Sequence, residues 1–214
     1  MKRNGIWVTA GLCLLMVAVA LSSLLFSRHP GKGVVVATVN GEPIYQSQID
    51  FLRNSRQLSL ANGLASIPQS GASEKQKAQM LEELKASAEK TDEELLLPLI
   101  LQKIKEQEAL RQGITVTYEE AYAQGATMFR QIKEAASHED APENAKKAWQ
   151  LLCDLMAVND MTEAEYLEQL VESSRRSIAI QRLEERLLAE NTGNITDFYL
   201  YVDDLLQAAE IVYH

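Results

Sequence analysis

The sequence contains little cysteine, histidine or aromatic side chain. Two cysteines occur among 214 residues, Cys13 and Cys153, and 6% of the residues are aromatic. Cys13 lies inside a long apolar segment and would be in lipid, so it cannot pair with Cys153, and neither a disulfide framework nor a cysteine metal site is expected. The histidines, His29, His138 and His214, lie far apart, and none has metal-ligand spacing on a helix. We therefore expect no metal and no cofactor.

Motifs for catalysis are also missing. The sequence has no GxSxG, GxGxxG, Walker-type loop, HExxH or CxxC. Adjacent acids such as Glu82 and Glu83 point to different sides of a helix, so they indicate solvated charge rather than an acid–base pair. The sequence predicts a protein that is not an enzyme.

Basic residues are scarce after the first part of the chain. Four of the 21 lysines and arginines (Lys2, Arg3, Arg28 and Lys32) precede residue 33, and no acid does, which leaves 21 − 4 = 17 basic against 30 acidic residues, or −13. Such a charge repels phosphates, so we expect no binding to nucleic acid.

An apolar segment opens the chain. Residues 6–26 are 21 residues without a charge, and a helix of that length spans roughly the 30 Å hydrocarbon core of a bilayer. Lys2 and Arg3 before it favour retention of the start in the cytoplasm and export of the rest. Ala18 and Ala20 offer a small-x-small signal cleavage site as the alternative. The sequence predicts a signal-anchor or transmembrane helix with a linker over 1–32, and an extracytoplasmic domain over 33–214.

The sequence predicts that the domain over 33–214 is mainly α-helical. A β-branched run at 34–39 reaches an Asn40-Gly41 turn, and a helix is expected from about Ser47 that fades by Asn62-Gly63. Further helices are expected over about 73–88, from Thr91, from Thr117, after Pro142, from Thr162 to about 190, and over 196–208. Pro98 requires either that its helix begins just before it or that the helix is kinked there. The closing AEIVYH is too short to be stable alone, and its natural partner is the strand at 34–39.

Two of the predicted helices carry large or soft apolar side chains. Such side chains are used by adaptable peptide-binding surfaces. Core packing explains the same pattern, and both interpretations stay open. The candidate peptide-binding residues are Met128, Phe129, Ile132, Trp149, Leu152 and Met156.

Three segments carry a family resemblance. VVVATVNGEPIYQSQID resembles the opening of the soluble part of SurA, PrsA and PpiD-type extracytoplasmic chaperones of bacteria, where a VNG-x-x-I turn leads into the first helix. LILQKIKEQEALRQGITVTYEEAYA is similar to that family's apolar helix ending in A-x-x-x-G-I-x-V, and YVDDLLQAAEIVYH looks like its closing helix and strand. The matching motif residues are Val39, Asn40, Gly41, Ile44, Gly113, Ile114 and Val116.

The resemblance implies a multi-helix chaperone lobe in which a small β element pairs the N- and C-terminal segments. It implies binding of unfolded or partly folded exported proteins without ATP. The family's parvulin prolyl isomerase domain usually stands between the long helix and the closing helix, where this chain has only residues 191–195, so isomerase activity is not expected. The alternative is a partner-specific membrane-anchored adaptor without general chaperone activity.

Overall fold

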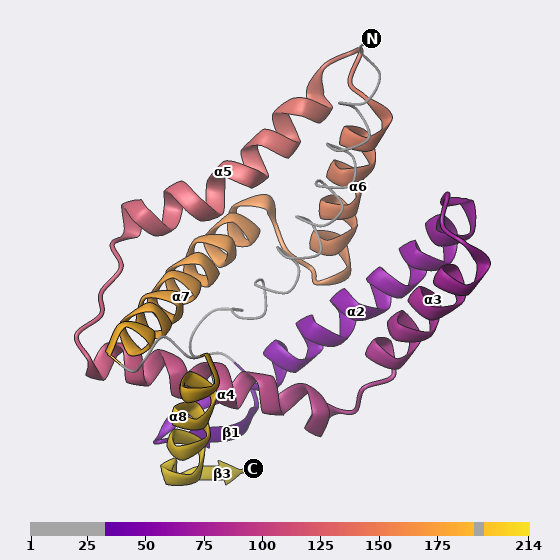
Figure 1. Cartoon of the computed structure of the whole chain (residues 1–214). Coiled ribbons are helices and arrows are strands. Elements are labelled where there is room, and N and C mark those ends of the chain that lie inside the picture. The colour runs from indigo at the N-terminus through magenta and orange to yellow at the C-terminus, as the bar shows by residue number, and fades with distance from the viewer. Residues whose placement is uncertain (1–32, 191–194) are drawn as a thin grey trace. The chain divides into compact units, whose positions relative to one another are not determined.

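The computed structural model describes residues 33–190 and 195–214. This part of the chain is mainly helical with a small three-stranded sheet (Figure 1). The elements are β1 (Val35–Val39), β2 (Glu42–Tyr45), α2 (Gln46–Ser66), the 3-10 helix η1 (Ile67–Gln69), α3 (Glu74–Ala88), α4 (Asp92–Arg111), α5 (Tyr118–Ser137), α6 (Glu143–Val158), α7 (Glu163–Glu190), α8 (Ile195–Ala208) and β3 (Ile211–Tyr213).

The predicted membrane segment over 1–32 lies outside the described residues. Among the helices over 33–190 and 195–214, none combines the length and the apolar character needed to cross a bilayer.

The sheet brings together segments from both ends of the described chain. Its strand order is β2-β1-β3, and β1 pairs antiparallel with both neighbours. Asn40 and Gly41 have positive φ values of 49° and 81°, as a tight turn with the right twist for a hairpin requires. Pro43 lies in β2, an edge strand, where its missing N–H breaks no central ladder. The predicted pairing of the closing segment with the first strand is confirmed by the Thr38–Val212 register.

Two compact units divide these residues, and each is described by itself. The bundle unit holds residues 114–181, and the sheet unit holds residues 33–113, 182–190 and 195–214. Helix α7 therefore contributes residues to both.

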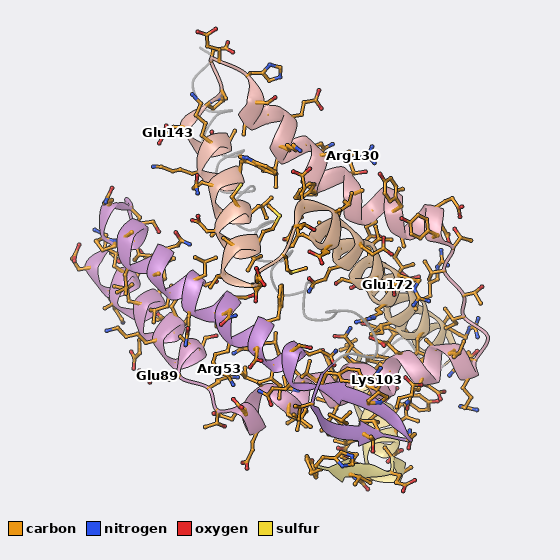
Figure 2. All side chains as sticks on the ribbon, turned by 180° about the vertical axis from the view of Figure 1, so that it is seen from behind. Arg53, Glu89, Lys103, Arg130, Glu143 and Glu172 are labelled. Atoms are coloured by element: carbon orange, nitrogen blue, oxygen red, sulfur yellow. The ribbon has the colours of Figure 1, made fainter. Side chains whose placement is uncertain are left out.

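In the sheet unit, α4 packs against β1, α2 and α8. Arg53, which Figure 2 labels on α2, forms ion pairs with Asp50, at 2.7 Å, and with Asp92 in the first turn of α4. Helix α4 begins well before Pro98, after a capping box between Thr91 and Glu94, and continues through the proline. The core of this unit is aliphatic, and its least exposed members include Val39, Ile44, Ile49, Leu52, Leu95, Leu99 and Ile100.

In the bundle unit, α5 and α6 pack together and the first part of α7 packs against α5. Gly125 on α5 allows a close approach of α7, because a Cβ there would lie 2.7 Å from the carbonyl oxygen of Leu170 on α7. Capping boxes begin two of these helices, as predicted. Glu120 accepts from the amide of Thr117 at 3.0 Å, and Glu165 accepts from the amide of Thr162 at 2.8 Å.

Candidate functional site

The candidate peptide-binding residues on α5 and α6 divide into buried and half-buried ones. Phe129 is 2% exposed, Leu152 is 5% exposed and Met156 is 8% exposed, so these side chains belong to the core of the bundle unit. Met128, Ile132 and Trp149 are half-buried. The structure thus places the six residues on two helices that pack together, brings Phe129 and Trp149 into contact, and leaves the second group in partial contact with solvent.

Phe129 is the centre of an aromatic cluster. Its ring lies edge-on to Trp149 with centroids 5.5 Å apart, and 5.7 Å from the ring of Tyr166 on α7. Burial raises the pKa of Tyr166 well above its ordinary value. The ammonium group of Lys133 lies over the Trp149 ring, 5.6 Å from its centroid. Aromatic pairs of this kind stabilise a core beyond the area they bury, so the cluster explains why the three helices pack together.

Exposed apolar side chains are more frequent in the sheet unit, and one group lies on the α2–α3 hairpin. Helix α3 packs against α2 and η1, yet none of its residues is buried. Met80 on α3 is 46% exposed and Leu64 on α2 is 49% exposed. Leu81 and Leu84 are half-buried. Helix α3 therefore has an apolar side that the sheet unit covers only in part. A helix of this length is marginal alone, and a further apolar segment that covered this side would stabilise it.

A second group of exposed apolar residues lies on α8 and β3. Tyr199 is 66% exposed, Leu200 is 60% exposed and Tyr213 is 67% exposed. Phe198 and Val202 of the same helix are buried. Helix α8 therefore has apolar residues on its solvent-exposed side as well as on its buried side.

The VNG motif residues support the sheet. Val39 and Ile44 are buried on either side of the turn. Asn40 donates from its side-chain amide to Gln107 on α4 at 2.8 Å, and its side-chain oxygen accepts from the amide of Glu210 at 2.9 Å. Gln107 in turn donates to the carbonyl of Val39 at 2.9 Å. The motif residue Asn40 is therefore a structural link between the turn, α4 and the segment that leads into β3.

The second motif lies where α4 ends. Gly113 has a φ of 71°, the left-handed conformation that favours glycine after a helix. Its amide donates to the carbonyl of Leu110 at 2.9 Å. Ile114 is 7% exposed and Val116 is half-buried. These residues end the helix and begin an extended connection, as the sequence predicts.

A buried carboxylate near this helix end is the most perturbed acid in the sheet unit. Glu108 is 4% exposed and accepts hydrogen bonds from Arg111 at 2.6 Å, from Gln112 at 2.7 Å and from the hydroxyl of Tyr201 on α8. Burial opposes ionisation of Glu108, but these hydrogen bonds outweigh it and lower its pKa to about 2. The ionised carboxylate is saturated with donors, which suits it to joining α8 to α4 and makes it a poor proton acceptor.

Glu108 and Arg111 also line a shallow pocket of about 190 Å³ together with Asn40, Gln107 and Leu205. Each of the four polar side chains among these already has a hydrogen-bond partner in the sheet unit. Over residues 33–190 and 195–214, no three histidine, cysteine or acidic side chains gather as metal ligands. Cys153 on α6 is a half-buried free thiol whose pKa is raised by burial.

Sequence reasoning missed the exposed residues Leu64, Met80, Tyr199 and Leu200. Their spacing matches that of core residues. The one signal in the sequence for exposure is on α3, which has few apolar residues.

No protein-family model, no curated protein sequence and no solved structure matches this chain.

Proposed function

We propose that the protein is a membrane-anchored, extracytoplasmic chaperone that binds unfolded or partly folded exported polypeptides without ATP. The observation that carries the proposal is the α2–α3 hairpin, where a 15-residue helix has no buried residue and where Leu64 and Met80 are about half exposed. Exposed apolar surface on a folded domain commonly marks a binding site. Methionine and leucine side chains adapt their shape to different partners, which suits a site that accepts many sequences.

Two further features support this function. The pairing of β1 with β3 agrees with the architecture that the resemblance to SurA, PrsA and PpiD-type chaperones implies. The net charge of −13 over residues 33–214, from 21 − 4 = 17 basic and 30 acidic residues, would keep a complex with an aggregation-prone client in solution.

The test uses the full chain in nanodiscs of zwitterionic lipid, added in several-fold excess to a chemically denatured model protein. We expect the chain to delay aggregation measured by light scattering, and empty nanodiscs to have no effect. Prolyl isomerisation, measured in the same preparation, is expected to be unchanged from the uncatalysed rate. Failure to delay aggregation of any client would overturn the proposal and would favour the partner-specific adaptor.

A pair of double variants locates the capture surface. Leu64→Ser with Met80→Ser should reduce the suppression of aggregation. Leu97→Ser with Leu110→Ser is the matched control, because Leu97 is 50% exposed and Leu110 is 69% exposed on α4 of the same unit. Equal losses in both variants would show that the α2–α3 hairpin is not the capture surface.

A further inference from the structure

Helix α8 has two chemically different sides. Phe198 and Val202 are buried, and the hydroxyl of Tyr201 reaches Glu108 on α4, so this side attaches α8 to the sheet unit. Residues spaced three and four apart lie on one face of a helix. Tyr199, Leu200, Asp203 and Asp204 therefore share the opposite side, which we call the α8 face, and all of them are exposed.

The apolar half of the α8 face is large for a solvent-exposed surface. Tyr199 is 66% exposed and Leu200, its neighbour in the sequence, is 60% exposed. The Tyr199 ring touches the ring of Phe198 edge-on, with centroids 6.0 Å apart, so Tyr199 extends outward from the edge of the core. Tyrosine is enriched in protein interfaces because it combines a broad apolar ring with a polar end.

The other half of the α8 face is acidic. Asp203 and Asp204 follow Tyr199 and Leu200 by one helical turn. Between Ile195 and Glu210 there are four acidic residues and no lysine or arginine, so the charges that this segment itself carries are all negative. A positively charged group placed here can approach a carboxylate and the face of the Tyr199 ring together.

We propose that the α8 face is a docking surface for a cationic amphipathic helix of another protein. Aliphatic side chains of that helix would cover Tyr199 and Leu200, and its lysines or arginines would pair with Asp203 and Asp204. This docking is separate from the capture of unfolded polypeptides on the α2–α3 hairpin and does not depend on it.

Charge argues against the other occupants. Nucleic acid and anionic lipid are repelled by the four acids, and a second copy of the same face would place like charges against each other. A cationic partner meets attraction instead of repulsion, and this attraction acts at long range and speeds its association.

The probe is a fluorescent peptide of about 14 residues built from leucine, alanine and lysine with apolar residues at three- and four-residue steps, long enough to form a helix. A neutral peptide with glutamine in place of lysine is the comparison. The full chain in zwitterionic nanodiscs is titrated, binding is followed by fluorescence anisotropy, and the signal from empty nanodiscs is subtracted. We expect the cationic peptide to bind more tightly than the neutral one, and its affinity to fall as salt rises from about 0.05 to 0.5 M.

Two double variants test the location. Asp203→Asn with Asp204→Asn should weaken binding of the cationic peptide by about tenfold, and Tyr199→Ser with Leu200→Ser should weaken binding of both peptides. Glu139→Gln with Asp140→Asn is the matched control. It also removes two adjacent acids that are both exposed, and these acids lie between α5 and α6, outside the α8 face and the α2–α3 hairpin.

The control variant should bind the cationic peptide as the unmodified chain does. Equal losses in the two acidic variants would mean that general charge attracts the peptide, and the proposal would be overturned. It would also be overturned if the neutral peptide bound as tightly as the cationic one. If Tyr199→Ser with Leu200→Ser abolished self-association and left peptide binding intact, the face would be a contact between two copies instead. Normal peptide binding without suppression of aggregation would uphold this inference and reject the chaperone function.

Discussion

Asn40 and Glu210 exchange two hydrogen bonds across 170 residues of sequence. The amide of Asn40 donates to the carbonyl of Glu210 at 2.8 Å, and the amide of Glu210 donates to the side-chain oxygen of Asn40 at 2.9 Å. One of these bonds depends on the side chain of Asn40 and the other does not, so a substitution at this position removes the side-chain bond and leaves the backbone bond available.

Asn40→Ala is expected to lower the free energy of unfolding by about 2–3 kcal/mol, because it removes side-chain bonds to Glu210 and Gln107 and places alanine in the left-handed region. Asn40→Gly loses the same bonds without the backbone cost, and we expect about half the effect. Urea unfolding followed by circular dichroism measures both. Equal effects of the two substitutions would show that the conformation of the turn contributes nothing.

Glu108→Gln is expected to destabilise the sheet unit at neutral pH by about 2 kcal/mol, because it exchanges a charge-assisted network for neutral hydrogen bonds. The pKa of Glu108 is lowered in the folded protein from 4.5 to about 2. The contribution of its charge is therefore complete above about pH 4.5 and is lost as the pH falls toward 2. Stability measured from pH 7 to 2 should show the two proteins converging over that window, and a constant difference would contradict the assignment.

Gly125→Ala is expected to lower the free energy of unfolding by about 2 kcal/mol. A Cβ at this position would lie 2.7 Å from the carbonyl oxygen of Leu170 and 2.8 Å from the Ser174 hydroxyl, so α5 and α7 would have to separate. Gly63→Ala is the control. Its Cβ would meet the flexible end of the Leu84 side chain, which can rotate, and alanine favours a helix over glycine by about 1 kcal/mol. Thermal unfolding should show a loss for the first variant only.

Phe129→Ala is expected to cost about 4 kcal/mol of stability, because it removes a ring that contacts both Trp149 and Tyr166. Met128→Ala, at a half-buried neighbour, should cost about 1 kcal/mol. Chemical unfolding gives both values, and peptide binding measured on the same proteins assigns each residue to core or surface. A Phe129→Ala variant of normal stability and reduced peptide binding would place Phe129 in a groove.

Local signals in the sequence predicted most helix starts. The side chains of Thr91 and Thr117 accept hydrogen bonds from the backbone amides of Glu94 and Glu120. The carboxylates of these glutamates accept in turn from the backbone amides of the threonines, as capping boxes require. The Asn40-Gly41 turn and the pairing of the closing segment with the first strand also followed from the sequence, because turn chemistry and β-branched runs act over short distances.

Tertiary contacts explain two elements that differ from the sequence-based predictions, the end of α2 and strand β2. Helix α2 was expected to fade at Asn62-Gly63, yet it continues to Ser66, where it packs against α3 and η1. Strand β2 (EPIY) was not expected, because the turn was expected to lead into the first helix near Ser47. The turn of Asn40 and Gly41 directs these residues back along β1, where the edge position tolerates Pro43.

The candidate sites were the least predictable part. Glu108 and Tyr201 lie 93 residues apart and meet only in the folded sheet unit. Periodicity places an apolar residue on a helix face but does not say whether another element covers it. Leu152 and Leu200 both occupy helical positions among apolar neighbours, yet the first is 5% exposed and the second 60% exposed.

The strand order β2-β1-β3 has a consequence for folding during synthesis. Strand β1 pairs with β2 as soon as the turn forms, but its other edge is filled only by residues 211–213. A ribosome adding about 5–20 residues per second needs on the order of ten seconds or more to make the intervening chain. During that time the open edge of β1 can pair with other strands. The sheet unit must therefore complete its folding late, and the growing chain would need protection of that edge until its closing strand has been made.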